Sequence, residues 1–111
     1  IHSFTPILEG IPRNTDIGLL YDPRRRDEQC LAQRWRQILV QIEPTLTIRR
    51  NYPYRGNSDG FTTHLRKHFP PHRYLGFEVE INQKHMMNPS RRQSIAEILL
   101  ASLHMLIDHS E

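Results

Sequence analysis

YLGFEVEINQ, residues 74–83, is the most informative stretch of this 111-residue chain. Apolar and polar residues alternate along it, the apolar ones being Leu75, Phe77, Val79 and Ile81. Because successive side chains of a strand point to opposite faces, the alternation predicts a β-strand with one apolar face. The other face carries Glu78, Glu80 and Asn82, and its two carboxylates should stand roughly 7 Å apart. The simpler interpretation is a half-exposed edge strand with two solvated acids.

The rest of the chain mixes strand and helix patterns. Short apolar runs predict strands at residues 1–5, 17–21 and 46–50. Apolar residues recurring every three or four positions predict helices at residues 27–43, 60–68 and 89–108, with Ser58 or Asp59 as a cap of the second. The predicted buried stripe of the first helix includes Cys30, and that of the last includes Leu103 and Ile107, while residues 7–16 and 51–60 are predicted loops. This order indicates a single α/β domain with a mixed sheet flanked by helices.

Composition limits the class of protein. Hydrophobic residues make up 37% and charged residues 24% of the chain, which favours a globular domain over a disordered one. No apolar run is long enough to span a bilayer, so no membrane partner is expected. Cys30 is the sole cysteine, which excludes an internal disulfide and fits a reducing, cytoplasmic location. Arginine clusters give a net charge of +3, and they could face an anionic ligand or simply solvent.

Two groups of polar residues could carry chemistry. Asn51, Tyr54 and Arg55 follow a predicted strand and offer an amide, a phenol and a guanidinium. These three groups are suited to binding a small carboxylate through hydrogen bonds. An ordinary tight loop shaped by Pro53 and Gly56 is the alternative. His64 and His68 have i, i+4 spacing, which could place two imidazoles on one helix face, with His72 as a third ligand. A solvated surface is the more common role of such a pair.

Three blocks of sequence resemble the N-formylglutamate amidohydrolase family. They are HSFTP (residues 2–6) followed by DIGLLY (16–21), NYPYRG (51–56), and GFEVEINQ (76–83). Their combination is fairly specific, although each block alone would not be. The resemblance covers the chain from its first residue to about Gln83. Beyond it, the last predicted helix resembles the family only in being a helix.

The resemblance implies a fold and a site. That family is related to the zinc carboxypeptidases and shares their phosphorylase/hydrolase-like α/β sandwich, with helices on both faces of a mixed sheet. By resemblance, His2 looks like one of three protein ligands of a catalytic zinc and Glu80 looks like the general base, with Glu78 as the competing carboxylate. Asn51, Tyr54 and Arg55 would then recognise the carboxylate of the substrate.

The chain departs from the family pattern in one respect. The other two zinc ligands, a His and a Glu, come in the family from a motif upstream of the His-Ser block, and no His-x-x-Glu pair occurs here. We therefore expect a C-terminal portion of a longer catalytic domain that binds zinc poorly alone. The partners expected are a second copy of the chain in a homo-oligomer or a missing upstream segment. The loop residues Arg13 and Asp16 could touch the site or only fix the loop.

The sequence thus predicts a zinc-dependent hydrolase of the amide bond of a small acylated amino acid such as N-formylglutamate. The alternative is an inactive partial relative that acts as a binding module for an anionic partner or nucleic acid. Nucleic acid is the less favoured partner, because the sequence lacks the basic groove interleaved with aromatics that single-strand binders use.

Overall fold

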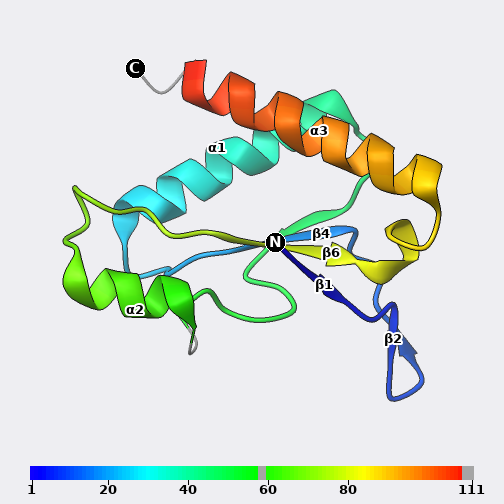
Figure 1. Cartoon of the computed structure of the whole chain (residues 1–111), viewed down its shortest axis with the longest axis horizontal. Helices are drawn as coiled ribbons and strands as arrows, with labels where there is room; N and C mark the ends of the chain where they lie inside the picture. The colour runs from blue at the N-terminus through cyan, green and yellow to red at the C-terminus, as the bar shows by residue number, and fades with distance from the viewer. Residues whose placement is uncertain (58–59, 109–111) are drawn as a thin grey trace.

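The protein is described by a computed structural model that covers residues 1–57 and 60–108. Its centre is a four-stranded mixed sheet in the order β1 (His2–Phe4), β6 (Glu78–Asn82), β4 (Ile17–Leu20) and β5 (Ile48–Arg50) (Figure 1). β6 is parallel to β1 and antiparallel to β4, and β4 is parallel to β5. The predicted α/β class and mixed sheet are therefore confirmed.

The alternating stretch forms an inner strand of this sheet. Only Glu78–Asn82 belongs to β6, and residues 74–77 approach it as irregular chain. The simpler interpretation, an edge strand, is wrong, because β6 pairs on both sides with β1 and β4. Both edges of β6 are consequently paired, and Val79, Glu80, Ile81 and Asn82 are all buried.

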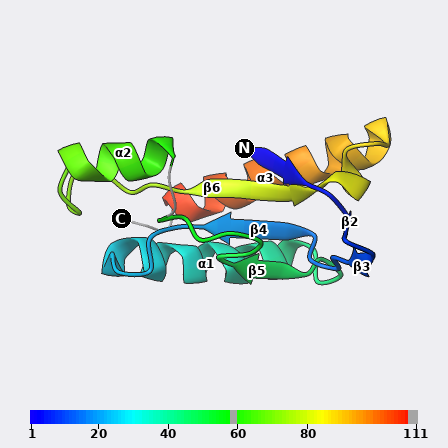
Figure 2. The ribbon, with the colours of Figure 1, turned by 90° about the horizontal axis from the view of Figure 1, so that it is seen from below.

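Two long helices pack on the same face of the sheet. α1 (Arg26–Ile42) and α3 (Pro89–Asp108) contact each other, and both lie behind the strands in Figure 2. Their buried side chains share one core with alternate residues of the strands: Ile17, Leu19, Trp35, Leu39, Ile48, Val79, Ile81, Ile95, Leu99 and Leu106. The indole N–H of Trp35 donates a 2.8 Å hydrogen bond to Ser102 Oγ inside this core. The opposite face of the sheet is left for other contacts.

The predicted helical stripes need three corrections. Cys30 is exposed, since α1 turns Glu28 and Ala32 inward instead. Leu103 and Ile107 are 37% and 65% exposed, because the buried line of α3 runs through Ile95, Leu99, Ser102 and Leu106. The second predicted helix, at residues 60–68, is confirmed as α2 (Phe61–His68), which lies beyond the amino end of β6 (Figure 1). Its predicted cap, Ser58 or Asp59, lies outside the described residues.

The predicted loop at 7–16 contains a small hairpin. β2 (Ile7–Leu8) pairs antiparallel with β3 (Ile11–Pro12). Glu9 and Gly10, which connect them, have φ values of 51° and 78°. Positive φ at both central residues fits the twist of a two-residue hairpin. A proline in the second strand argues locally against pairing, which explains why the sequence pattern predicted a loop.

A polar cluster ties β4, β6 and α3 together. Asp16 accepts hydrogen bonds from Thr47 N–H and His85 Nε2, each at 2.7 Å, and pairs with Lys84 at 3.2 Å. Arg91 Nε donates to His85 Nδ1 at 2.9 Å, which leaves the proton of a neutral imidazole on Nε2. Burial acts to raise the pKa of Asp16, but the hydrogen bonds outweigh it and hold the pKa below its ordinary value.

The helices of the described residues contain no segment that is both long and apolar enough to cross a membrane.

Candidate functional site

A pocket of about 460 Å³ opens on the sheet face that α1 and α3 do not cover. Side chains of β1, α2 and β6 line it, among them His2, Phe61, Thr62, Glu78 and Glu80. The strand pairing creates this grouping, because β1 places His2 directly beside Glu80 in the parallel register. We call this the acidic pocket. It brings together three of the six residues that the sequence analysis predicted for the site.

Glu80 is the most unusual residue of the acidic pocket. It is only 6% exposed, and within the described part of the chain its Oε2 is buried with no hydrogen-bond partner. Burial raises the pKa of Glu80 above its ordinary value, the nearby charge of His2 opposes this, and Glu78 adds to it. A buried carboxylate without a partner destabilises a fold. A carboxylate with a raised pKa is also suited to accepting a proton near neutral pH.

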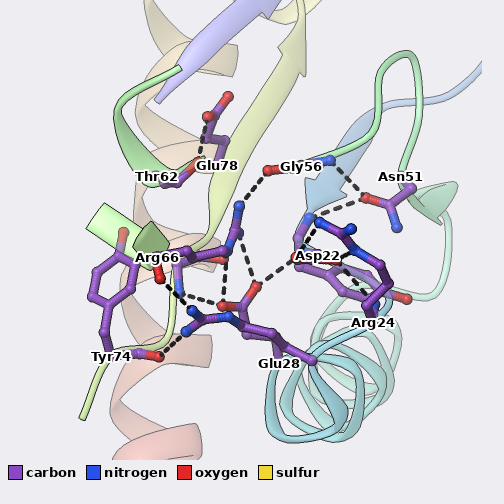
Figure 3. A network of polar contacts seen from close by, with 12 residues as sticks. Asp22, Arg24, Glu28, Asn51, Gly56, Thr62, Arg66, Tyr74 and Glu78 are labelled. Atoms are coloured by element: carbon purple, nitrogen blue, oxygen red, sulfur yellow. Dashed lines mark hydrogen bonds and ion pairs between the residues drawn. The ribbon is translucent and has the colours of Figure 1, made fainter. Parts of the chain in front are cut away.

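Glu78 differs from Glu80 although both lie on one face of β6. Its Oε1 accepts a 3.0 Å hydrogen bond from Thr62 Oγ1, which joins β6 to α2 (Figure 3). Glu78 is also less buried than Glu80. The structure therefore separates the two predicted carboxylates into one that is held by a hydroxyl and one that keeps an unpartnered oxygen.

No complete metal site is present among residues 1–57 and 60–108. Within these ranges, no three His, Cys, Asp or Glu side chains lie close enough together to hold a metal ion. His64 and His68 do lie close, with ring centroids 4.7 Å apart, but His72 does not complete a site with them. His2 could supply a single ligand, so the described residues alone do not fit the zinc that the resemblance implies.

The loop of residues 51–56 does not bring its polar side chains to the acidic pocket. Asn51 has a φ of 52°, and its Oδ1 accepts hydrogen bonds from Tyr21 N–H at 3.0 Å and Gly56 N–H at 3.1 Å (Figure 3). Tyr54 is 55% exposed and Arg55 is exposed as well. The Asn51 amide oxygen thus holds the loop against β4, while the predicted role of all three residues in binding a carboxylate stays a prediction.

Two glycines let this loop lie close to β4. A side chain at Gly18 would collide with the backbone carbonyl of Tyr52, and one at Gly56 would collide with the backbone of Tyr21. Gly18 pairs with Glu80 across the sheet. Only residues without a Cβ therefore allow the loop to lie this close to β4, the strand that pairs with β6.

Arg13 and Asp16 fix the chain rather than line the acidic pocket. The amide of Asn82 donates to the backbone carbonyl of Arg13 at 2.8 Å, and the Arg13 guanidinium lies 5.7 Å from the ring of Phe4. Asp16 belongs to the cluster that includes His85. Both residues stabilise the far end of β6.

The sequence pattern did not predict a buried ion pair that lies next to the site. Glu28 of α1 is fully buried, and its carboxylate accepts from Arg66 Nε at 3.0 Å and Arg66 Nη2 at 2.8 Å (Figure 3). It also accepts from the backbone N–H of Asp22 at 2.9 Å and of Gly76 at 3.1 Å. These bonds join α1, α2 and the approach to β6, and so they position α2 over the acidic pocket.

Comparisons with known proteins identify similarity to a solved structure. Family models give no match to this chain, and neither do curated proteins. The crystal structure of gene product Atu2144 from Agrobacterium tumefaciens is similar over 94% of this chain, with a TM-score of 0.66 and 31% sequence identity. The chain spans 40% of the length of that protein. The similarity supports the compact α/β arrangement.

Proposed function

We propose that this chain carries part of the active site of a zinc-dependent hydrolase that cleaves the amide bond of a small N-acyl amino acid, such as N-formylglutamate. The observation that carries the proposal is the buried, unpartnered oxygen of Glu80 beside His2 in an open pocket. The reaction class comes from the resemblance to the N-formylglutamate amidohydrolases. The same resemblance suggests a zinc-carboxypeptidase-like sandwich as the fold of the complete catalytic domain.

Glu80 acts in this proposal as the general base. It accepts a proton from the attacking water as the new carbon–oxygen bond forms. It then returns that proton to the amide nitrogen as the carbon–nitrogen bond breaks, so that the products are a carboxylic acid and a free amine. The raised pKa of Glu80 brings its basicity closer to what proton transfer at neutral pH requires. Glu78 assists indirectly, since its charge acts to raise the pKa of Glu80.

Zinc enters the proposal only through His2. A bound zinc ion lowers the pKa of its water ligand toward 7. Because the described residues do not form a complete metal site, we route no step of the reaction through the metal. The proposal requires further ligands from residues other than 1–57 and 60–108, in the same chain or in a partner.

The test compares two matched carboxylate variants in the protein that contains this chain. We expect Glu80→Gln to lower kcat on N-formylglutamate roughly 100-fold or more and to leave the zinc content unchanged. Glu78→Gln, which keeps an oxygen for the Thr62 hydroxyl, should lower kcat far less. Formate release and metal content are the two measurements. Equal activity of Glu80→Gln and the wild type would refute the role of Glu80, and no turnover of any N-acyl amino acid by the zinc-loaded wild type would refute the function.

A further inference from the structure

A second pocket, of about 410 Å³, is also lined in part by α2 but by other residues of this helix than the acidic pocket. Its charged lining consists of Arg24, Arg25, Arg66, Lys67 and Asp22, with the amide of Asn57 beside them. We call it the cationic pocket. It shares no lining residue with the acidic pocket, so it is a separate feature of the surface.

The ion pairs of the cationic pocket leave two positive charges unmatched. Arg24 pairs with Asp22 at 3.2 Å, and Arg66 pairs with the buried Glu28 at 2.8 Å. Arg25 and Lys67 have no carboxylate within ion-pair distance in the part of the chain that the structure describes. A pocket with two unmatched cations favours a ligand with two negative charges.

The unmatched guanidinium is held rigidly in place. Arg25 donates to the backbone carbonyls of Tyr74 at 3.3 Å, Arg66 at 2.7 Å and Phe69 at 3.1 Å. These bonds use three of the five N–H donors of an arginine. Because backbone carbonyls carry no net charge, they do not neutralise the guanidinium. Lys67, in contrast, is exposed on α2 and can move toward a ligand. Fixed donors lose little entropy on binding.

We propose that the cationic pocket binds a small dianion, a phosphate group or a pair of carboxylates, independently of the acidic pocket. The ammonium of Lys67 and the unused N–H groups of Arg25 would contact the anion, and the amide of Asn57 would add a neutral donor. Charge-assisted hydrogen bonds of this kind are the strong ones in proteins. The volume of about 410 Å³ leaves room for an organic group attached to the anion.

Isothermal titration calorimetry with inorganic phosphate, succinate and chloride at low ionic strength tests this proposal. We expect saturable binding of phosphate or succinate but not of chloride. The dianion that binds more tightly shows whether the pocket prefers a phosphate group or a pair of carboxylates. Lys67→Ala should weaken the binding about tenfold. Arg92→Ala, which removes an equal charge from the exposed surface of α3, should leave it unchanged.

Three results would overturn the proposal: no saturable binding of either dianion, equal weakening by Lys67→Ala and Arg92→Ala, or chloride binding as tight as dianion binding. The last two would mean that general electrostatic attraction is being measured. Glu80→Gln should not alter dianion binding, so the cationic pocket and the proposed amide hydrolysis succeed or fail separately.

Discussion

The buried ion pair of Glu28 and Arg66 offers the sharpest test of how this fold is held together. We expect Glu28→Gln to lower the free energy of unfolding by about 3–5 kcal/mol, the usual cost of breaking a buried pair. The side chain of Glu28 is fully buried and that of Arg66 is 6% exposed, so solvent cannot replace the lost charge. The amide also places an NH₂ group opposite N–H donors that now meet a carboxylate oxygen.

Urea denaturation followed by tryptophan fluorescence measures this loss, because Trp35 lies in the core. With a slope of about 1–3 kcal/mol per M, a loss of about 3 kcal/mol shifts the midpoint by at least roughly 1 M. Glu97→Gln is the matched control, since Glu97 is exposed on α3 and bonds only to Gln93 among the described residues. It should change stability by less than about 0.5 kcal/mol. A loss below about 1 kcal/mol for Glu28→Gln would refute the reasoning.

Three further perturbations have defined outcomes. Ser102→Ala leaves the buried indole N–H of Trp35 without its acceptor and should lower the free energy of unfolding, measured by urea denaturation, by about 1–3 kcal/mol. Ser102→Thr keeps a hydroxyl and therefore tests whether the loss of the acceptor is the cause. Gly56→Ala should reduce the folded fraction seen by circular dichroism, because its Cβ would collide with the backbone of Tyr21; a stable Gly56→Ala variant would contradict that contact. The pKa of Asp16 is lower in the folded protein than in the unfolded chain, so ionised Asp16 stabilises the fold at pH values above its unfolded pKa. This stabilisation is lost as the pH falls through the folded pKa. Asp16→Asn lacks the carboxylate, so it should be less stable than the wild type at pH 7 and should lose less stability on acidification.

The elements that the sequence predicted well are those with a strong local period. The alternation at 78–82 and the three-to-four spacing through Trp35 identified β6 and α1 without any knowledge of the fold. Short-range patterns cannot say which strands are neighbours, however. The pairing of β6 with β1 joins residues about 80 positions apart, and it excludes the alternative interpretation of this stretch as an edge strand.

The ion pair of Glu28 and Arg66 illustrates why the rest could not be predicted. Asp27 and Glu28 both appear in the sequence as acids in the first turn of a helix, where negative charge is favourable. Only the folded chain reveals that Glu28 turns inward to meet a side chain 38 positions away. For Asn51, the residue type itself allowed a structural interpretation, because asparagine is one of the few residues that readily adopt positive φ.

The polar face of β6 explains why the proposal singles out Glu80. Asn82 is fully buried, and it is satisfied by bonds to the carbonyls of Arg13 and Thr15 and from the N–H of Lys84. Glu78 is held by a threonine hydroxyl. Glu80 alone of these three, within the described residues, has a buried oxygen without a partner. An unpartnered buried carboxylate oxygen costs stability, and a titratable group with a raised pKa at a pocket is a candidate for a functional site, so this contrast is the reason that the proposal assigns the role of general base to Glu80 and not to Glu78.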